Sequence, residues 1–85
     1  MEYHLYILVS QSNGRLYIGS TNDVERRQKE HHANNTKSTR GKGPWNVLFT
    51  KAYETKAEAQ AWERKLKSWK NKNRILEWVA KQAEE

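Results

Sequence analysis

The chain has 85 residues, and a typical domain has about 100–200. The length therefore predicts one small domain, residues 1–85. Lys and Arg number 16 against 10 Asp and Glu, and this net charge of +6 favours an acidic partner, most commonly nucleic acid. The lack of cysteine excludes disulfides, thiolate metal sites and a cysteine nucleophile, and fits a reducing, cytoplasmic location. No apolar run approaches the roughly 18–20 residues of a membrane span, so we expect no membrane partner.

The expected elements are, in chain order, strands at 3–9 and 15–20, a helix from Asn22 to about His32, a basic loop at 33–44, a strand at 45–53, a helix from Thr55 to about Trp69 and a helix from Arg74 to about Gln82. Between the first two strands, Asn13-Gly14 favours a two-residue type I′ turn. Asn22 and Thr55 are expected to cap the helices that follow them. The order ββαβαα predicts a small α/β (α+β) domain, with a three-stranded antiparallel sheet flanked by helices.

The predicted hairpin separates its side chains into two faces, because strand residues alternate. One face carries the apolar residues Leu5, Ile7, Val9, Leu16 and Ile18. The other carries Tyr6 and Tyr17 beside Gly19, which leaves room for a close approach. With a two-residue turn, Tyr17 would pair with a residue of the first strand that lies four positions, about 13 Å, beyond Tyr6. A looser turn would shift this pairing and bring the two rings together. The alternative is that both are ordinary strand aromatics.

Two helices carry polar residues on faces that should turn inward. Val24, Arg27 and His31 follow i, i+3, i+7 spacing and form the only face of the first helix with an aliphatic residue. The alternative is a loosely docked, solvated helix. On the second helix, Glu63 lies at the flank of an apolar stripe, and the alternative to a functional role is an i,i+4 pair with Lys67.

Basic residues gather in the loop and at the end of the second helix. At the helix end they are partly explained by the helix dipole, which favours cations at a C-terminus. Together they predict a phosphate-binding surface. The residues that we expect to contact nucleic acid are Lys37, Thr39, Arg40, Lys42, Lys67 and Lys70.

The sequence resembles the GIY-YIG nuclease family over residues 3 to about 79. The resemblance lies in His4-Leu5-Tyr6, in Tyr17-Ile18-Gly19 and in Arg27 and His31 of the next helix, with Glu63 where the family has its metal-binding glutamate. His4 and Leu5 depart from the first glycine and isoleucine of the family name. The chain looks most similar to small single-domain bacterial members described as UvrC-like or as predicted endonucleases.

The resemblance implies a metal-dependent endonuclease whose catalytic residues are Tyr6, Tyr17, Arg27, His31 and Glu63. Glu63 would hold one Mg²⁺, or Mn²⁺ in its place, and Arg27 would neutralise charge on the phosphoryl oxygens. One of the two tyrosines, in a solvent-facing pocket with Arg27, would orient or deprotonate the attacking water.

The implied substrate is DNA, of irregular or branched structure, in repair or recombination. The family's larger nucleases attach separate DNA-binding domains, and we expect none in this chain. We therefore expect DNA shape, a protein partner or self-association to supply specificity. The alternative is a non-catalytic, basic DNA-binding module that keeps the fold.

Overall fold

The computed structural model describes residues 2–32 and 44–83. The elements are β1 (Tyr3–Ser10), β2 (Leu16–Thr21), α1 (Val24–His32), β3 (Trp45–Tyr53), α2 (Lys56–Trp69) and α3 (Lys72–Ala83). The strands form one antiparallel sheet in the order β2-β1-β3, so β1 lies in the centre. This architecture confirms the predicted fold class. Within the described ranges, no helix is long and apolar enough to cross a membrane.

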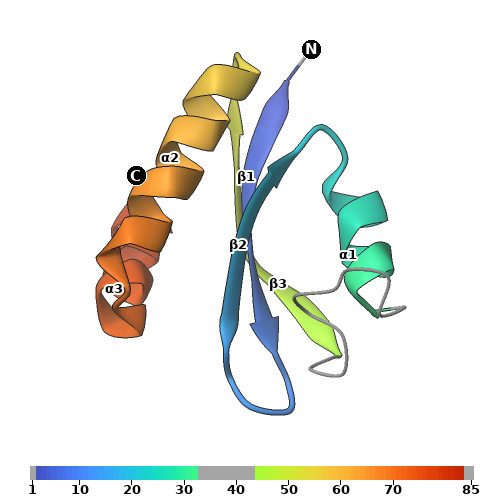
Figure 1. The fold of residues 1–85 in the computed structure, drawn as a ribbon, viewed down its shortest axis with the longest axis vertical. Coiled ribbons are helices and arrows are strands. Elements are labelled where there is room, and N and C mark those ends of the chain that lie inside the picture. The colour runs from blue at the N-terminus through green and yellow to red at the C-terminus, as the bar shows by residue number, and fades with distance from the viewer. Residues whose placement is uncertain (1, 33–43, 84–85) are drawn as a thin grey trace.

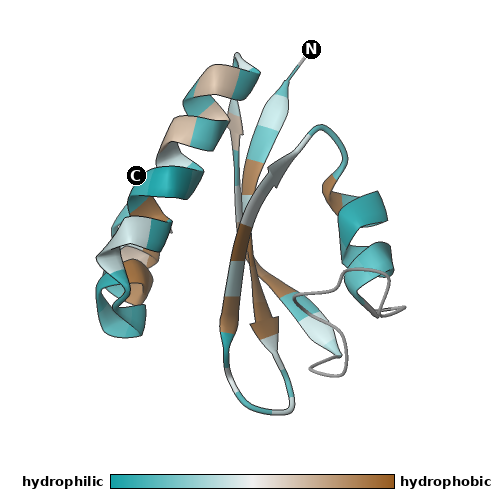
Figure 2. Cartoon of the chain, viewed as in Figure 1, coloured by the Kyte–Doolittle hydropathy of each residue, from teal (hydrophilic) through white to brown (hydrophobic). Residues whose placement is uncertain are grey.

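Helices cover both faces of the sheet, with α2 and α3 on one side and α1 on the other (Figure 1). The α2/α3 face buries an aliphatic core of Leu5, Ile7, Ile18, Leu66 and Ile75, with tryptophan side chains packed around it. The α1 face buries Tyr6, Leu8 and Trp45, against which Tyr17 and Val24 pack. Figure 2 shows the hydrophobic residues concentrated in the strands, whereas α1 is hydrophilic along most of its length.

The hairpin is wider than predicted, and the two-residue turn is wrong. Val9 pairs with Leu16, and the chain reverses over the four residues 11–14. The Ser10 hydroxyl accepts hydrogen bonds from the amides of Ser12 and Asn13 at 3.2 and 3.3 Å, so the loop satisfies its own donors. Only Gly14 has a positive φ there, at 73°, whereas a type I′ turn needs two such residues.

The helix termini follow local capping chemistry. Asp23, and not Asn22 as predicted, caps α1, because its carboxylate accepts from the amide of Arg26 at 3.0 Å. Thr55 caps α2 as predicted, accepting from the amide of Glu58 at 3.2 Å. The break between α2 and α3 is shorter than expected: Lys70 adopts a left-handed conformation (φ 50°), and α3 already begins at Lys72.

Candidate active site

The two hairpin tyrosines lie together on the α1 face. In the observed register Tyr6 pairs with Gly19 and Leu8 pairs with Tyr17, so the tyrosines are offset by two positions only. Their ring centroids are 6.2 Å apart. The looser turn therefore brings them together, as the sequence alternative anticipated. The solvent-facing pocket is wrong for Tyr6, which is 1% exposed, whereas Tyr17 is half-buried.

Gly19 is required by the position of the Tyr6 ring. A Cβ atom built on Gly19 would lie 2.5 Å from the Tyr6 Oη and 2.6 Å from its Cζ. Real Cβ atoms essentially never show such contacts, so any side chain at this position would force the buried Tyr6 ring to shift. The Tyr6 ring thus packs directly on the β2 backbone, and it can do so because Gly19 has no side chain.

α1 places an imidazole against both tyrosines. His31 is fully buried, its Nε2 lies 3.4 Å from the Tyr6 Oη, and its ring centroid lies 4.5 Å from that of Tyr17. Trp45 of β3 closes the cluster, with its ring centroid 6.4 Å from those of both His31 and Tyr17. The i, i+3, i+7 face of α1 is therefore turned inward, and the solvated-helix alternative is wrong.

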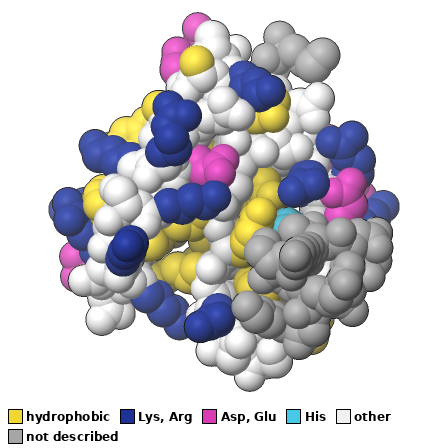
Figure 3. Space-filling view, viewed as in Figure 1, with side chains coloured by type: hydrophobic (Ala, Val, Ile, Leu, Met, Phe, Trp, Pro, Cys, Tyr) yellow, Lys and Arg dark blue, Asp and Glu magenta, His cyan; other side chains and the backbone are white. Residues whose placement is uncertain are grey.

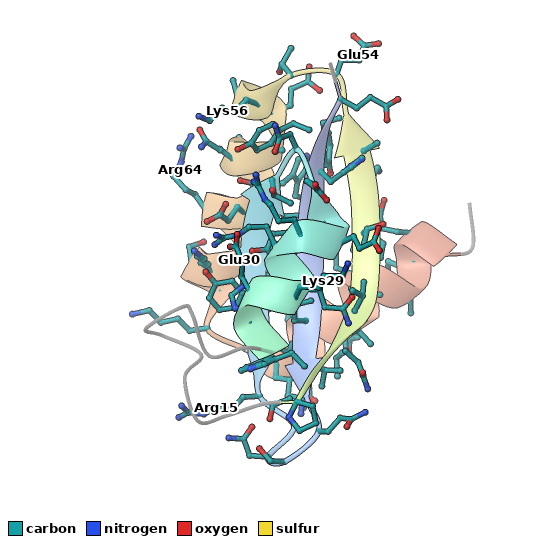
Figure 4. All side chains as sticks on the ribbon, turned by 90° about the vertical axis from the view of Figure 1, so that its right-hand side faces the viewer. Arg15, Lys29, Glu30, Glu54, Lys56 and Arg64 are labelled. Carbon is teal, nitrogen blue, oxygen red and sulfur yellow. The ribbon has the colours of Figure 1, made fainter. Side chains whose placement is uncertain are left out.

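Arg27 links this aromatic cluster to the surface. One guanidinium nitrogen donates to Glu30 at 2.7 Å, and the guanidinium also donates to the Tyr6 hydroxyl. Burial raises the pKa of Tyr6 above its ordinary 10.0, and the hydrogen bond from Arg27 offsets only part of this effect. Tyr6 is therefore held as a neutral phenol. In Figure 4, Glu30 lies on the side of α1 nearer β2, and Lys29 lies on the opposite side.

Glu63 reaches the β2 edge of the same region from α2. Its Oε1 accepts from the Ser20 hydroxyl and its Oε2 from the Lys67 ammonium, each at 2.7 Å. The predicted pair with Lys67 is thus present. The Glu63 carboxylate also contributes to the raised pKa of Tyr6, so its field extends to the tyrosine cluster.

Sequence reasoning missed two polar partners, Ser20 and Glu30. Strand alternation could have found Ser20, because it follows Gly19 and must point to the opposite face, toward α2. The i,i+3 spacing from Arg27 could have found Glu30.

A divalent ion fits the chemistry of Glu63. The side chain is 22% exposed, so one carboxylate faces solvent in a fixed orientation. Among the described residues no three His, Cys, Asp or Glu side chains cluster as metal ligands. Mg²⁺ commonly binds through one or two carboxylates and completes its shell with water and substrate phosphates. Glu63 therefore supplies the kind of ligand that such an ion uses, with water and a phosphodiester left to complete the shell.

Next to Glu63, a hollow of about 260 Å³ opens between β2, α2 and α3. Its floor is apolar, and its rim carries the cations Arg15, Lys67, Lys70 and Lys72. Figure 3 shows Lys and Arg side chains distributed over this face, around a strip of hydrophobic atoms. The predicted nucleic-acid contacts Lys67 and Lys70 lie here. The other four, Lys37, Thr39, Arg40 and Lys42, lie outside the described residues.

Comparison with known proteins gives a consistent result. The sequence matches the GIY-YIG catalytic domain over residues 2–75. It is 41% identical over 68 residues to the UPF0213 protein BH0048 of Halalkalibacterium halodurans, covering 79% of this chain and 71% of that protein. A UPF0213 protein of Haloquadratum walsbyi is 38% identical over 69 residues, which are 80% of this chain and 78% of that one. The solution NMR structure of BH0048 from Bacillus halodurans is similar with a TM-score of 0.59 and 36% identity, over 94% of this chain and 84% of that chain.

Proposed function

The chain belongs to the GIY-YIG nuclease family, and we propose that it is a divalent-metal-dependent endonuclease that hydrolyses DNA phosphodiester bonds. The observation that carries the proposal is the convergence on one region of two tyrosines, a buried histidine and an arginine, with a carboxylate at its edge. A buried imidazole and a half-buried guanidinium are costly to place in so small a domain. A functional role explains why they are retained.

Arg27 binds the scissile phosphate in this proposal. The guanidinium has five N–H donors in a planar fork, and Glu30 and Tyr6 use only part of them. The remaining donors can hold the phosphoryl oxygens and neutralise the charge that grows on them in the transition state. Glu30 and Tyr6 fix the orientation of the fork before the substrate arrives, which reduces reorganisation during the reaction.

The two tyrosines have different roles. Tyr6 is buried and neutral, so it orients Arg27 and His31 through its hydroxyl. Tyr17 packs against His31 and is the more exposed of the two phenols, so it is the one that can reach a water molecule. We assign to Tyr17 the task of orienting the attacking water through its hydroxyl.

Glu63 holds the metal ion, with its carboxylate fixed by Ser20. Bound there, Mg²⁺ or Mn²⁺ would supply positive charge to stabilise the leaving 3′ oxygen. The rim cations of the hollow beside Glu63 would bind neighbouring phosphates of the DNA strand.

The proposal is tested by cleavage of labelled linear, nicked, flapped and branched DNA with Mg²⁺, Mn²⁺ or EDTA. We expect metal-dependent cleavage, fastest on the irregular or branched DNA that arises in repair and recombination. Glu63→Gln should lower the rate by at least about 100-fold, because it removes the metal ligand's charge. Glu77→Gln, at an exposed position of α3, is the matched control and should cleave like the parent.

The competing function is DNA binding without catalysis, in which the cationic rim matters and Glu63 does not. It predicts DNA binding but no metal-dependent cleavage of any substrate by the parent protein. Cleavage that persists unchanged in Glu63→Gln would point to a contaminating nuclease and would contradict the proposal.

A further inference from the structure

The environment of Glu63 contains a cation that belongs to the protein. The Lys67 Nζ lies 2.7 Å from the Glu63 Oε2, and the other carboxylate oxygen accepts from the Ser20 hydroxyl. Each oxygen of the carboxylate therefore accepts one hydrogen bond, from a neutral donor at Oε1 and from a charged donor at Oε2. The charged donor already balances the negative charge that a divalent ion would use.

We propose that Lys67 is a resident counter-cation of Glu63, which a divalent ion must displace in order to bind. The inference rests on the proposed role of Glu63 as metal ligand. An ammonium group and a divalent ion on the same carboxylate repel each other, because both are positive and lie within a few ångströms. Metal binding and the Lys67–Glu63 ion pair are thus alternatives.

The two hydrogen-bond partners of Glu63, Ser20 and Lys67, differ in whether they can keep their contact when an ion binds. Ser20 is neutral and sits on a strand, so it can keep donating to Oε1 while a cation occupies Oε2. Such a donor orients a ligating carboxylate. Lys67 lies at the end of a flexible stem with 51% of its side chain exposed, so its ammonium can swing away at little cost.

When the ion displaces it, the Lys67 ammonium lies close to the proposed DNA-binding surface. Its side chain lines the hollow beside Lys70 and Arg15, among the rim cations proposed to bind DNA phosphates. A phosphate can there replace the carboxylate as the partner of the ammonium. Lys67 therefore keeps Glu63 oriented before the metal binds and returns to the DNA-binding surface when it does.

The test is a titration of the protein with Mn²⁺ alone, in which the free ion is followed by its electron paramagnetic resonance signal. Lys67→Met should bind Mn²⁺ about three- to fivefold more tightly than the parent, because the competing cation is gone, whereas Lys67→Arg keeps the competing charge and should show no such gain. Lys65→Met is the matched control: it removes the same charge from the same helix, but its ammonium lies over the Trp62 ring, 4.6 Å from the centroid. Its affinity should stay within about twofold of the parent value.

Equal or weaker Mn²⁺ binding by Lys67→Met, including the case in which neither protein binds the ion, would overturn the inference. Glu63→Gln, made in the parent and in Lys67→Met, separates this failure from that of the proposed function: loss of Mn²⁺ binding by Glu63→Gln shows that the ion binds at Glu63, whether or not Lys67 competes. If the double variant loses the gain, the ion binds at Glu63 and the inference stands. If the double variant keeps it, the ion binds elsewhere, and the metal role of Glu63 is wrong.

Discussion

The two faces of the sheet are built from the same alternating strands but differ in what they bury. The α2/α3 face is a core of aliphatic and tryptophan side chains. The α1 face buries Tyr6, Trp45 and His31, and α1 contributes a single aliphatic residue, Val24. The first arrangement stabilises the domain at low cost, whereas the second retains polar groups that a core does not need. The comparison indicates that the aliphatic core and the tyrosine, histidine and arginine cluster lie on opposite faces of one small sheet, with Glu63 reaching the β2 edge from the core side.

The largest effect on stability is expected on the α2/α3 face. Ile7 is fully buried in the centre of the sheet, and Ile7→Ala should lower the free energy of unfolding by about 2–5 kcal/mol. For a domain of this size that is a large share of the total stability. Urea denaturation measures the change. A loss below 1 kcal/mol, on the order of a surface substitution, would show that this face does not dominate stability.

A smaller effect is expected where the α1 face meets β2. Gly19→Ala places a methyl group against the Tyr6 ring and should cost about 1–3 kcal/mol by overpacking. The double variant Gly19→Ala, Tyr6→Leu should recover stability, because the ring is gone, while cleavage stays low. Additive losses in the double-mutant cycle would contradict the contact between the two positions.

The pH dependence of stability should distinguish a tyrosine on each face. Burial raises the folded pKa of both Tyr6 and Tyr53 above 10.0. Their contribution to stability is therefore complete below the unfolded pKa near 10 and is lost as the pH rises through the folded pKa. Tyr6→Phe should flatten the decline in unfolding free energy above pH 10 more than Tyr53→Phe, because Tyr6 is the more deeply buried. The reverse order would contradict the burial of Tyr6.

The smallest expected effect on stability comes from the basic loop, whose substitution should change the salt dependence of DNA affinity instead. If about 4–6 phosphates are contacted, log affinity should fall against log salt with a slope of roughly −4 to −5. Replacing Lys37, Arg40 and Lys42 together by Gln should flatten this slope by roughly two or three units while leaving urea stability unchanged. A parent slope near zero would exclude nucleic acid as the partner.

Local periodicity predicted most of the site, and side-chain contacts decided the rest. Strand alternation placed Tyr6 and Tyr17 on one face, and helical spacing turned Arg27 and His31 inward, because both periods are fixed by the backbone. The hairpin register was missed because hydrogen bonds of the Ser10 hydroxyl favour a longer loop than the Asn13-Gly14 pair indicates.

The burial of Tyr6 was missed for a different reason. It depends on how closely α1 and Trp45 pack over the hairpin, and no pattern within a single element encodes that distance. The Ser20 contact with Glu63 likewise joins residues that are far apart in the sequence.

The most direct test of the account is a single-turnover cleavage assay of Arg27→Lys beside Arg26→Lys. Both arginines pair with Glu30, but Arg26 is 58% exposed and only Arg27 reaches Tyr6. Lysine keeps the charge and loses the planar fork, so Arg27→Lys should lower the rate by at least about 100-fold with an unchanged unfolding midpoint. Arg26→Lys should cleave like the parent. Parent-like cleavage by Arg27→Lys would contradict the assignment of phosphate binding to Arg27 on the α1 face.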